Sequence, residues 1–338
     1  MQGAVIYGKG DVRLEELPEP TIVEPTDAIV RTAATCVCGS DLWQYRGIAP
    51  VPEPKPFGHE YCGIVEAVGP DVRTVRPGQF VIGPFFVGDN TCPNCRNGIQ
   101  TACLNGMLMS GCQAEAIRIP MADGNLVATP EPPPDEQVAD LLTLSDVMAT
   151  GWYAAECARV EPGMTVAVVG DGAVGLCGII SAAQMGAERI IAMSRHAPRQ
   201  ALATQFGATD IVEERGDDGV ARIKDMTQGI GADATLECVG TAGAMTQAIQ
   251  STRPGGFVGF VGVPHDVSIP GEDLFRLQVG LRGGPAPVRR FLPDLITRVL
   301  DGKILPGKVF DSVLPLGQVA EGYRAMDQRR AIKVLLKP

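Results

Sequence analysis

Two short motifs near the N-terminus hold the residues best suited to chemistry. They are Cys38-Gly-Ser-Asp41 and, a little further along the chain, Gly58-His59-Glu60. Cys38 offers a thiolate and His59 offers an imidazole, and zinc binds both groups well. Each motif also supplies a carboxylate able to orient or tune such a ligand. The two motifs together predict a metal site.

A further motif, far downstream, is suited to binding a dinucleotide. The apolar run 166–169 is predicted to be a strand, and it leads into Gly170-Asp-Gly172-Ala-Val-Gly175 at the start of a predicted helix. The first glycine permits a tight turn, the second lets a pyrophosphate approach the backbone, and the third lets helix and strand pack closely. A metal site and a nicotinamide site on one chain predict metal-assisted hydride transfer. The predicted cofactor-binding residues of the turn are Gly170, Gly172, Ala173, Val174 and Gly175.

The end of the next predicted strand indicates which nicotinamide cofactor binds. An NAD site usually has Asp or Glu about 20 residues beyond the glycines, where it binds the ribose hydroxyls. This chain has Ser194 and Arg195 there, with Arg199 close behind. Arginine pairs well with a 2′-phosphate, so these residues predict NADP(H) in preference to NAD(H). The alternative is that the two arginines are solvated surface charges.

Composition narrows the class of protein. At 338 residues the chain is long enough for about two domains. Its content of 45% hydrophobic and 20% charged residues is that of a globular protein, and no apolar run approaches the roughly 20 residues of a membrane span. A net charge of −10 argues against nucleic acid or anionic membranes as partners.

The ten cysteines are interpreted as thiols rather than disulfides. The N-terminus lacks the basic segment and cleavage site of a secretory signal, which predicts a cytoplasmic location and a reducing environment. Three cysteines cluster with the spacing of metal ligands, at Cys92, Cys95 and Cys103. Apart from Cys38, the remaining six cysteines lie among apolar or small residues and are expected to be buried and inert: Cys36, Cys62, Cys112, Cys157, Cys177 and Cys238.

The distribution of predicted strands and helices divides the chain. Residues 1–147 are rich in Gly, Pro and short β-type runs, which predicts a mostly β domain, with a helix beginning at Asp135. From about Thr165, strands (166–169, 189–193, 209–212, 234–237, 257–261) alternate with helices (173–184, 198–206, 218–227, 242–251). That alternation predicts a parallel sheet covered on both faces. Beyond Gly283-Gly-Pro285 a helix is predicted over 291–300 and a strand over 332–336.

The motifs resemble those of the zinc-containing medium-chain alcohol dehydrogenase family. Cys-Gly-Ser-Asp-Leu, then Gly-His-Glu-x-x-Gly-x-Val-x-x-Val-Gly over 58–69, then the glycine-rich turn appear in the family's order and spacing. The resemblance spans essentially the whole chain. It implies an α/β fold in which a doubly wound Rossmann domain (148–284) is inserted into a mostly β GroES-like catalytic domain (1–147 and 285–338).

The resemblance also implies a ligand set for a catalytic zinc. The family takes its third ligand from the region just before the Rossmann domain, where Asp146 is the one ligand-type residue. Cys38, His59 and Asp146 would leave a fourth position open for water or substrate. An aspartate there is similar to the secondary-alcohol branch, which is commonly NADP-dependent. Near the C-terminus, Lys333 resembles a basic residue that approaches the cofactor, with a plain surface lysine as the alternative.

Neighbouring residues acquire roles by the same resemblance. Asp41 resembles the carboxylate that receives the ring N–H of the ligating histidine, and Glu60 resembles an acid behind the metal. Ser40 matches the hydroxyl that begins the proton relay. Trp43 stands where the family often has a histidine, and an indole cannot shuttle a proton at neutral pH. Trp43 and Phe85 either shape the substrate pocket or simply pack in the core.

A second metal is implied by the stretch from Asp89 to Cys103. It resembles the family's structural zinc lobe, whose four cysteines have the same spacing, but its first position is an aspartate. Carboxylate oxygen is an acceptable zinc ligand. The predicted structural site is therefore Asp89, Cys92, Cys95 and Cys103, and the alternative is an empty lobe with free thiols.

The function predicted from these features is an NADP-dependent zinc alcohol dehydrogenase that acts on secondary alcohols, or equally reduces ketones and aldehydes. The alternatives are a polyol or other medium-chain zinc dehydrogenase and a non-catalytic NADPH-binding relative, at which Trp43 hints. Zinc-free reductases of the same fold would not need Cys38, His59 and Asp146. Family members pair Rossmann sheets edge to edge, so a homodimer or homotetramer is expected, with 278–282 as the interface strand.

Overall fold

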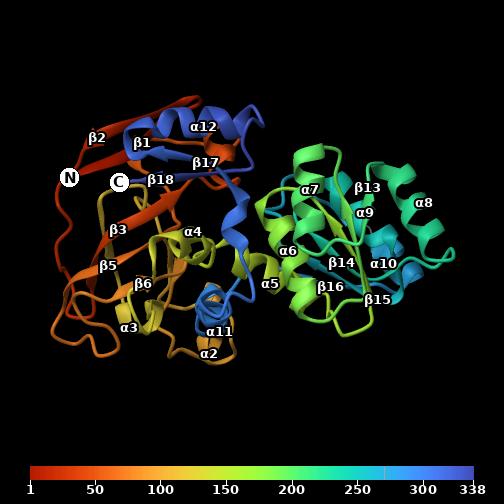
Figure 1. Cartoon of the computed structure of the whole chain (residues 1–338), viewed down its shortest axis with the longest axis horizontal. Coiled ribbons are helices and arrows are strands. Elements are labelled where there is room, and N and C mark those ends of the chain that lie inside the picture. Colours follow the sequence, from red (N-terminus) through yellow and green to blue (C-terminus); the bar gives the residue numbers. More distant parts are fainter. Residues whose placement is uncertain (270) are drawn as a thin grey trace. The chain divides into compact units, whose positions relative to one another are not determined.

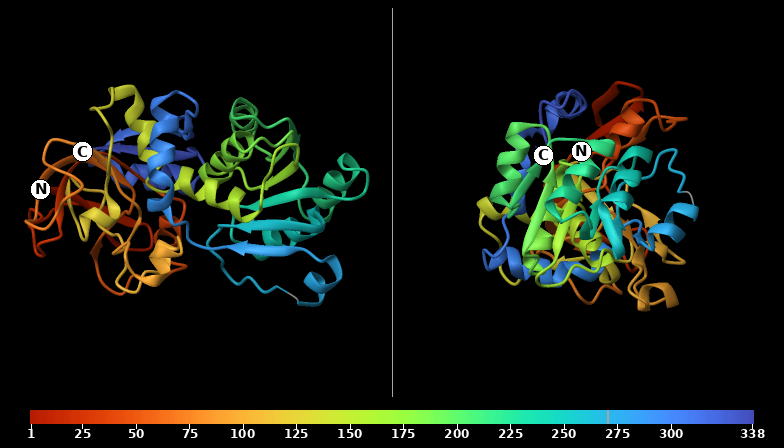
Figure 2. Two further views of the ribbon diagram at one scale, coloured as in Figure 1. Left: turned by 90° about the horizontal axis from the view of Figure 1, so that it is seen from below. Right: turned by 90° about the vertical axis from the view of Figure 1, so that its right-hand side faces the viewer.

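The computed structural model describes residues 1–269 and 271–338 and contains two compact units. The first unit comprises Met1–Ala149 and Pro287–Pro338, and the second comprises Thr150–Ala286. Both ends of the chain therefore belong to the first unit, where the N- and C-terminal segments lie together (Figures 1 and 2). The chain passes from the first unit to the second within helix α5 (Val147–Cys157).

The first unit is built mainly from short strands. A seven-stranded sheet has the order β10-β6-β5-β3-β18-β17, with β9 paired to β3, and a smaller sheet has the order β2-β1-β4. Its strands are β1 (Gln2–Gly8), β2 (Asp11–Glu16), β3 (Ala28–Cys36), β4 (Lys55–Pro56), β5 (Tyr61–Val68), β6 (Phe80–Ile82), β7 (Phe86–Val87), β8 (Met107–Leu108), β9 (Ala116–Ile119), β10 (Val127–Ala128), β17 (Phe310–Pro315) and β18 (Lys333–Lys337). Its helices are α1 (Asp41–Tyr45), α2 (Pro93–Arg96), α3 (Ala122–Asn125), α4 (Asp135–Thr143), α11 (Val288–Leu300) and α12 (Val319–Asp327).

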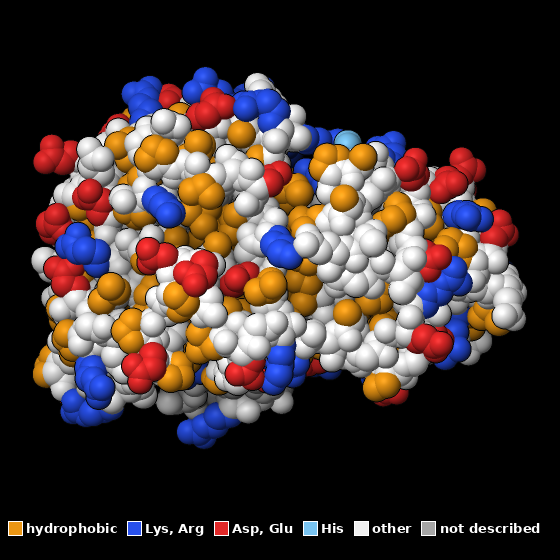
Figure 3. Space-filling model, viewed as in Figure 1, with side chains coloured by type: hydrophobic (Ala, Val, Ile, Leu, Met, Phe, Trp, Pro, Cys, Tyr) orange, Lys and Arg blue, Asp and Glu red, His pale blue; other side chains and the backbone are white. Residues whose placement is uncertain are grey.

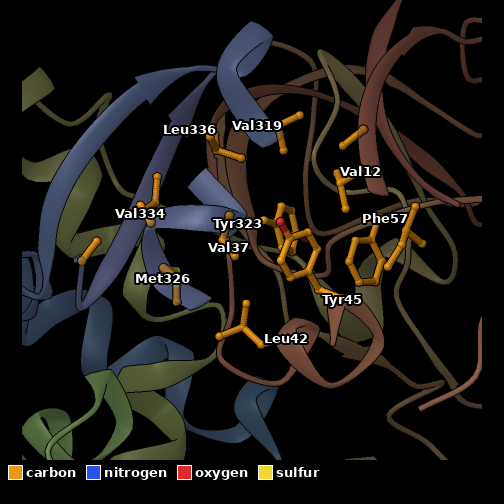
Figure 4. Packing of buried hydrophobic residues seen from close by; sticks show 14 of the residues in the cluster. Val12, Val37, Leu42, Tyr45, Phe57, Val319, Tyr323, Met326, Val334 and Leu336 are labelled. Atoms are coloured by element: carbon orange, nitrogen blue, oxygen red, sulfur yellow. The ribbon is translucent and has the colours of Figure 1, made fainter. Parts of the chain in front are cut away.

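The two chain ends share one hydrophobic core. Strand β18 pairs antiparallel with β3, so that Leu335 lies opposite Cys36 and Leu336 lies opposite Thr35. The core beside this pairing combines N-terminal side chains such as Val37 with C-terminal side chains such as Leu336 (Figure 4). Burial of these apolar groups joins the ends, and it places the C-terminal strand next to the strand that leads to Cys38.

The second unit is an open parallel sheet with the strand order β13-β12-β11-β14-β15-β16. Helices flank it (Figure 1), and its strands are nearly continuous apolar runs because both faces are covered. This is the doubly wound dinucleotide-binding order, so the predicted fold class is confirmed. The strands are β11 (Thr165–Val169), β12 (Arg189–Met193), β13 (Asp210–Val212), β14 (Ala232–Glu237), β15 (Thr252–Phe260) and β16 (Gly280–Gly283). The helices are α6 (Ala173–Gln184), α7 (Ala197–Gln205), α8 (Gly216–Met226), α9 (Ala242–Ser251) and α10 (Gly271–Leu277).

Two elements of the second unit differ from the sequence prediction. Strand β15 begins at Thr252 rather than at 257, although Pro254-Gly-Gly has the composition of a turn. A register shift in its pairing with β14, between Ala232 and Ala234, accommodates those residues as a bulge. Helix α10 was not predicted. None of its described residues is fully buried, and only Leu274 and Leu277 among them pack against the core, which is too short an apolar pattern to reveal a helix of seven residues.

Among the described residues, no helix is both long and apolar enough to cross a bilayer. On the face shown in Figure 3, acidic and basic side chains are interspersed rather than gathered by sign. The net negative charge of the chain is thus distributed over this face without forming a single acidic patch.

A core substitution in β18 tests whether the chain ends support each other. Replacing fully buried Leu336 by alanine should lower the free energy of unfolding by about 2–5 kcal/mol, because it removes methyl groups and leaves a cavity. The matched control is Val313→Ala on neighbouring β17, whose side chain is 55% exposed. Denaturant unfolding followed by circular dichroism measures both. Equal losses in the two variants would contradict a shared core.

Candidate active site

Local backbone structure sets the position of Cys38. Strand β3 ends at Cys36, and helix α1 begins at Asp41. The Cys38 backbone N–H donates to Asp41 Oδ2 at 3.0 Å, which closes the intervening turn. Ser40 is the N-cap residue of α1, half-buried, and its hydroxyl makes no capping bond, so it is available for other partners.

The backbone conformation of Gly58 sets the position of His59 near Cys38 and Asp41. Its φ of +84° lies in the left-handed region, and a Cβ there would clash with the side chain of Gln113. His59 follows immediately and precedes β5. Its Nδ1 lies 3.2 Å from Asp41 Oδ1 and its Nε2 lies 3.3 Å from Asp146 Oδ2. A proton on Nδ1, donated to Asp41, leaves the Nε2 lone pair directed toward Asp146.

Asp146 reaches the same place from the turn between α4 and α5. The preceding residue, Ser145, is fully buried and ties this turn to the sheet. Its Oγ accepts the N–H of Tyr61 at 3.1 Å and donates to the carbonyl of Gly83 at 2.8 Å. These two hydrogen bonds of Ser145 could not be predicted from the sequence, because a serine beside a ligand-type aspartate does not reveal its partners. As a result, Asp146 Oδ2 lies 3.5 Å from Cys38 Sγ.

Four donor groups therefore converge in the first unit. One donor atom from each of Cys38, His59, Glu60 and Asp146 lies within 4.8 Å of the others. Three of the four are acidic, and the burial of Glu60 is complete. Oε2 of Glu60 is buried and has no hydrogen-bond partner among the described residues. A buried, orphaned carboxylate oxygen beside a thiol and an imidazole fits a cation, and the mixture of S, N and O donors fits zinc.

The electrostatics of His59 agree with this shortage of positive charge. Burial opposes protonation of the ring. The charge of Asp41 and hydrogen bonds to Asp146 and Asp41 nevertheless raise its pKa well above the usual value. Burial raises the pKa of the Cys38 thiol, which is one of the four donors, and also that of nearby Cys36, which is not.

Lys333 supplies one of the cations. Its Nζ lies 2.6 Å from Glu60 Oε1 and 3.2 Å from the carbonyl oxygen of Val37, and the residue is 1% exposed. It is therefore not the plain surface lysine that the sequence left open. Its predicted approach to the cofactor stays a prediction.

The two predicted pocket residues lie in the first unit. Phe85 presents a T-shaped contact to the His59 ring, with centroids 6.1 Å apart and an interplanar angle of 76°. Trp43 is half-buried on α1. Phe85 thus borders the donor cluster, whereas for Trp43 the choice between lining a pocket and packing stays open.

A second donor set lies in the lobe around α2. Atoms of Asp89, Cys92, Cys95 and Cys103 lie within 4.8 Å of one another, and Cys92 Sγ is 3.9 Å from Cys103 Sγ. The Asp89 carboxylate also accepts the N–H groups of Cys92 and Thr91, and these bonds hold its pKa well below the usual value. The cluster of buried apolar groups here consists of the three cysteines with Phe86 against them. So little apolar burial favours a bound metal as the support of the lobe.

In the second unit, the glycine-rich turn has the predicted geometry. Gly170 has φ +118°, and a Cβ on Gly175 would overlap the carbonyl group of Gly170. A Cβ on Gly172 would meet nothing within 4 Å, so the backbone at the N-terminus of α6 is open to a ligand. Open backbone N–H groups at this point of a doubly wound fold fit a pyrophosphate.

The end of β12 holds a group that the sequence did not reveal. Asp171, within the glycine-rich turn, accepts the Ser194 hydroxyl at 2.8 Å and pairs with Arg199 at 3.2 Å. Arg215, just before α8, lies 4.0 Å from the same carboxylate. Burial works against ionisation, but Ser194 and the arginine charges lower the pKa of Asp171. Arg195 is exposed. The sequence analysis therefore named Arg199 but missed Asp171, its partner, and Arg215.

Comparison with known proteins agrees with the site. Residues 24–131 match the alcohol dehydrogenase GroES-like domain, and residues 173–285 match the zinc-binding dehydrogenase model. A probable zinc-binding alcohol dehydrogenase of Mycobacterium tuberculosis is 36% identical over 100% of this chain and 89% of its own. An alcohol dehydrogenase of Thermus sp. ATN1 superposes with a TM-score of 0.92 at 32% identity, over 100% of this chain and 99% of its own. The 2R,3R-butanediol dehydrogenase of Bacillus subtilis has a TM-score of 0.83 at 25% identity, over 100% and 99% of the two chains. The chain belongs to the zinc-containing medium-chain alcohol dehydrogenase family.

Proposed function

We propose that this protein is an NADP-dependent zinc alcohol dehydrogenase that interconverts secondary alcohols and ketones, and that it also reduces aldehydes. The observation that carries the proposal is the convergence of Cys38, His59 and Asp146 with Glu60 behind them. Zinc-free oxidoreductases of this fold have no use for such a donor set. A non-catalytic role would leave the buried Glu60 oxygen and the oriented His59 without purpose.

Each residue of the site has a defined task in this proposal. Cys38, His59 and Asp146 would hold the zinc, with Glu60 close enough to tune it. Zinc in such a site polarises the substrate oxygen and favours loss of the alcohol proton near neutral pH. Asp41 fixes the tautomer of His59.

The proton path follows from Ser40 and Trp43. The Ser40 hydroxyl makes no capping bond, and it is proposed to take the alcohol proton. Trp43 can donate a hydrogen bond but cannot pass a proton on, because an indole nitrogen has no lone pair to accept one. The side chain at position 43 would therefore not continue the relay, and the proton taken by Ser40 would leave by way of cofactor hydroxyls and water.

The choice of a secondary alcohol rests on the aspartate at position 146 and on the relatives. The Bacillus subtilis neighbour is named for 2R,3R-butanediol, whose hydroxyl groups are both secondary. The same name favours the second candidate function, a polyol dehydrogenase that uses the same zinc. A comparison of kcat/KM for a simple secondary alcohol with that for a vicinal diol separates the two.

The proposed cofactor preference rests on charge at the end of β12. Asp171 accepts the Ser194 hydroxyl and lies beside Arg199 and Arg215, and exposed Arg195 directly follows Ser194 in the chain. Gln200 also links the Ser194 carbonyl to the carboxylate of Glu213. A dianionic 2′-phosphate would draw Arg199 and Arg215, which lie 3.2 Å and 4.0 Å from the Asp171 carboxylate, into contacts with itself. If Asp171 instead takes the ribose hydroxyls, NAD becomes the preferred cofactor.

Structural zinc and assembly complete the proposal. We place a second zinc on Asp89, Cys92, Cys95 and Cys103. Edge strand β16 is the proposed interface of a homodimer or homotetramer. A small-molecule alcohol or carbonyl compound is the proposed partner, and the cytoplasm is the proposed location, which suits ten cysteines that form no disulfide bond.

Removing the metal tests the proposed reaction. Oxidation of 2-butanol with NADP should disappear after zinc is stripped with a chelator and should return when zinc is restored, because the alcohol proton is lost readily only beside the metal. Cys38→Ser should abolish turnover, whereas Cys62→Ser, at a buried thiol outside the donor set whose contact is the carbonyl of Ala34, should retain it. Turnover that survives metal removal would refute the zinc mechanism.

Neutralising the arginines tests the cofactor preference. In the double variant Arg195→Ala with Arg199→Ala, kcat/KM for NADP should fall about 10- to 100-fold, because charged hydrogen bonds contribute about 1.5–3 kcal/mol. The value for NAD should change by less than about threefold. Arg222→Ala, an exposed cation of α8, is the control. An equal loss with both cofactors would argue against a 2′-phosphate site.

Zinc content tests the second site. The purified protein should contain two zinc ions per chain, one for each donor set. Cys95→Ser should lose one of them and keep the catalytic one, and Cys38→Ser should do the reverse. Elemental analysis by mass spectrometry after extensive dialysis gives the stoichiometry. One zinc in the native protein, retained by Cys95→Ser, would show that the lobe is empty.

A further inference from the structure

We infer that Tyr323 and Gln113 are positioning residues for the catalytic metal, acting through Asp41 on His59. The inference rests on the proposed zinc site and extends it to a helix near the C-terminus. Tyr323 lies on α12, and its hydroxyl is 3.3 Å from Asp41 Oδ2. Neither residue is marked by any motif near the metal ligands.

Asp41 is the point at which the ligands are connected. Its carboxylate receives three groups: the backbone N–H of Cys38 at 3.0 Å, the Nδ1 of His59 at 3.2 Å, and the hydroxyl of Tyr323. The first two fix the positions of two proposed zinc ligands relative to each other. The third holds the carboxylate itself, because without it Oδ2 has a single donor among the described residues.

The hydrogen bonds around Tyr323 favour Asp41 as the acceptor of its hydroxyl proton. Gln113 Nε2 lies 2.9 Å from the Tyr323 oxygen and 2.9 Å from the carbonyl oxygen of Cys36, so its two N–H groups can serve both. The phenol oxygen then accepts from Gln113 Nε2. Two acceptors lie within reach of its one proton, Gln113 Oε1 at 3.0 Å and Asp41 Oδ2 at 3.3 Å, and the carboxylate is favoured because a charged acceptor is stronger than an amide. Burial raises the pKa of Tyr323 well above the usual value, so this donor stays protonated.

Packing keeps the Tyr323 ring from moving. Phe57 stacks on it with centroids 5.6 Å apart at 18°, and Tyr45 lies on it at 5.3 Å and 31°. Figure 4 shows the Tyr323 ring between these aromatics and next to Val37. The surrounding cluster is apolar, so a phenylalanine would pack equally well there. The hydroxyl is therefore explained by its hydrogen bonds to Gln113 and Asp41 and not by the core.

The amide of Gln113 is held with similar rigidity. Its backbone N–H donates to the carbonyl of Phe57, and the side chain fills the space that the missing Cβ of Gly58 leaves open. Gly58 immediately precedes His59. The glycine of the histidine motif thus provides room for the residue that orients Tyr323.

Zinc affinity tests the inference, and Tyr45 provides the matched control. Tyr323→Phe deletes only the hydroxyl and should weaken zinc binding at the catalytic site about 3- to 10-fold, which is less than the 10–100-fold typical for a direct partner of a ligating histidine. Tyr45→Phe makes the same change in the same ring cluster, without a bond to Asp41 in the described structure, and should leave the affinity unchanged. Competition with a chromophoric chelator measures both dissociation constants.

Two further variants make the outcome decisive. Gln113→Met should weaken zinc binding as Tyr323→Phe does, and the double variant should be no weaker than the weaker single variant, since both act on one hydrogen bond. The visible spectrum of the cobalt-substituted protein should change in Tyr323→Phe and stay unchanged in Tyr45→Phe. An effect confined to the unfolding temperature of the metal-free protein, with equal zinc affinities, would overturn the inference.

The zinc baseline separates this inference from the proposed function. If Cys38→Ser removes no zinc from the protein, the proposed catalytic site itself fails. If Cys38→Ser removes one zinc while Tyr323→Phe binds as tightly as the native protein, the site stands and only the role of Tyr323 and Gln113 is refuted.

Discussion

Buried negative charge is the constraint on which the first unit depends. Cys38, Asp41, Glu60 and Asp146 all lie in its interior, and burying ionised groups costs several kcal/mol each unless cations and hydrogen bonds compensate them. His59 and Lys333 each compensate part of this charge, and a bound zinc ion would compensate the rest. Lys333 comes from the last strand of the chain, so the charge balance of the site requires that β18 pair with β3.

The second unit meets a different requirement, since it must expose backbone rather than bury charge. Gly172 leaves open space above the first turn of α6, while Gly175 lets that helix lie against the turn. Asp171 then spaces its arginines around the end of β12 instead of leaving them to solvent. The loop that binds the pyrophosphate in this fold thereby also brings two arginines together near the end of β12.

Much of this could be read from the sequence, and the physical reason is locality. Strands β11 and β12 and helices α6 and α9 have periodic apolar patterns bounded by glycine or polar residues, which are local signals. The motifs around Cys38 and His59 likewise hold their chemistry within a few residues. Ser145, Gln113 and Asp171 could not be predicted, because each acts on a partner that only tertiary structure brings near. The bulge at the start of β15 was missed because its compensation lies on another strand.

The contact between Lys333 and Glu60 spans 273 residues, and that between Tyr323 and Asp41 spans 282. During synthesis, the segment with Cys38 and His59 leaves the ribosome first. The whole second unit is made before Tyr323 and Lys333 appear. Such non-local contacts form late because loop closure must precede them. Until the final strand is released, the nascent chain therefore lacks the buried cation that pairs with Glu60 and the hydroxyl that holds Asp41, so the charge balance of this interior depends on completion of the polypeptide.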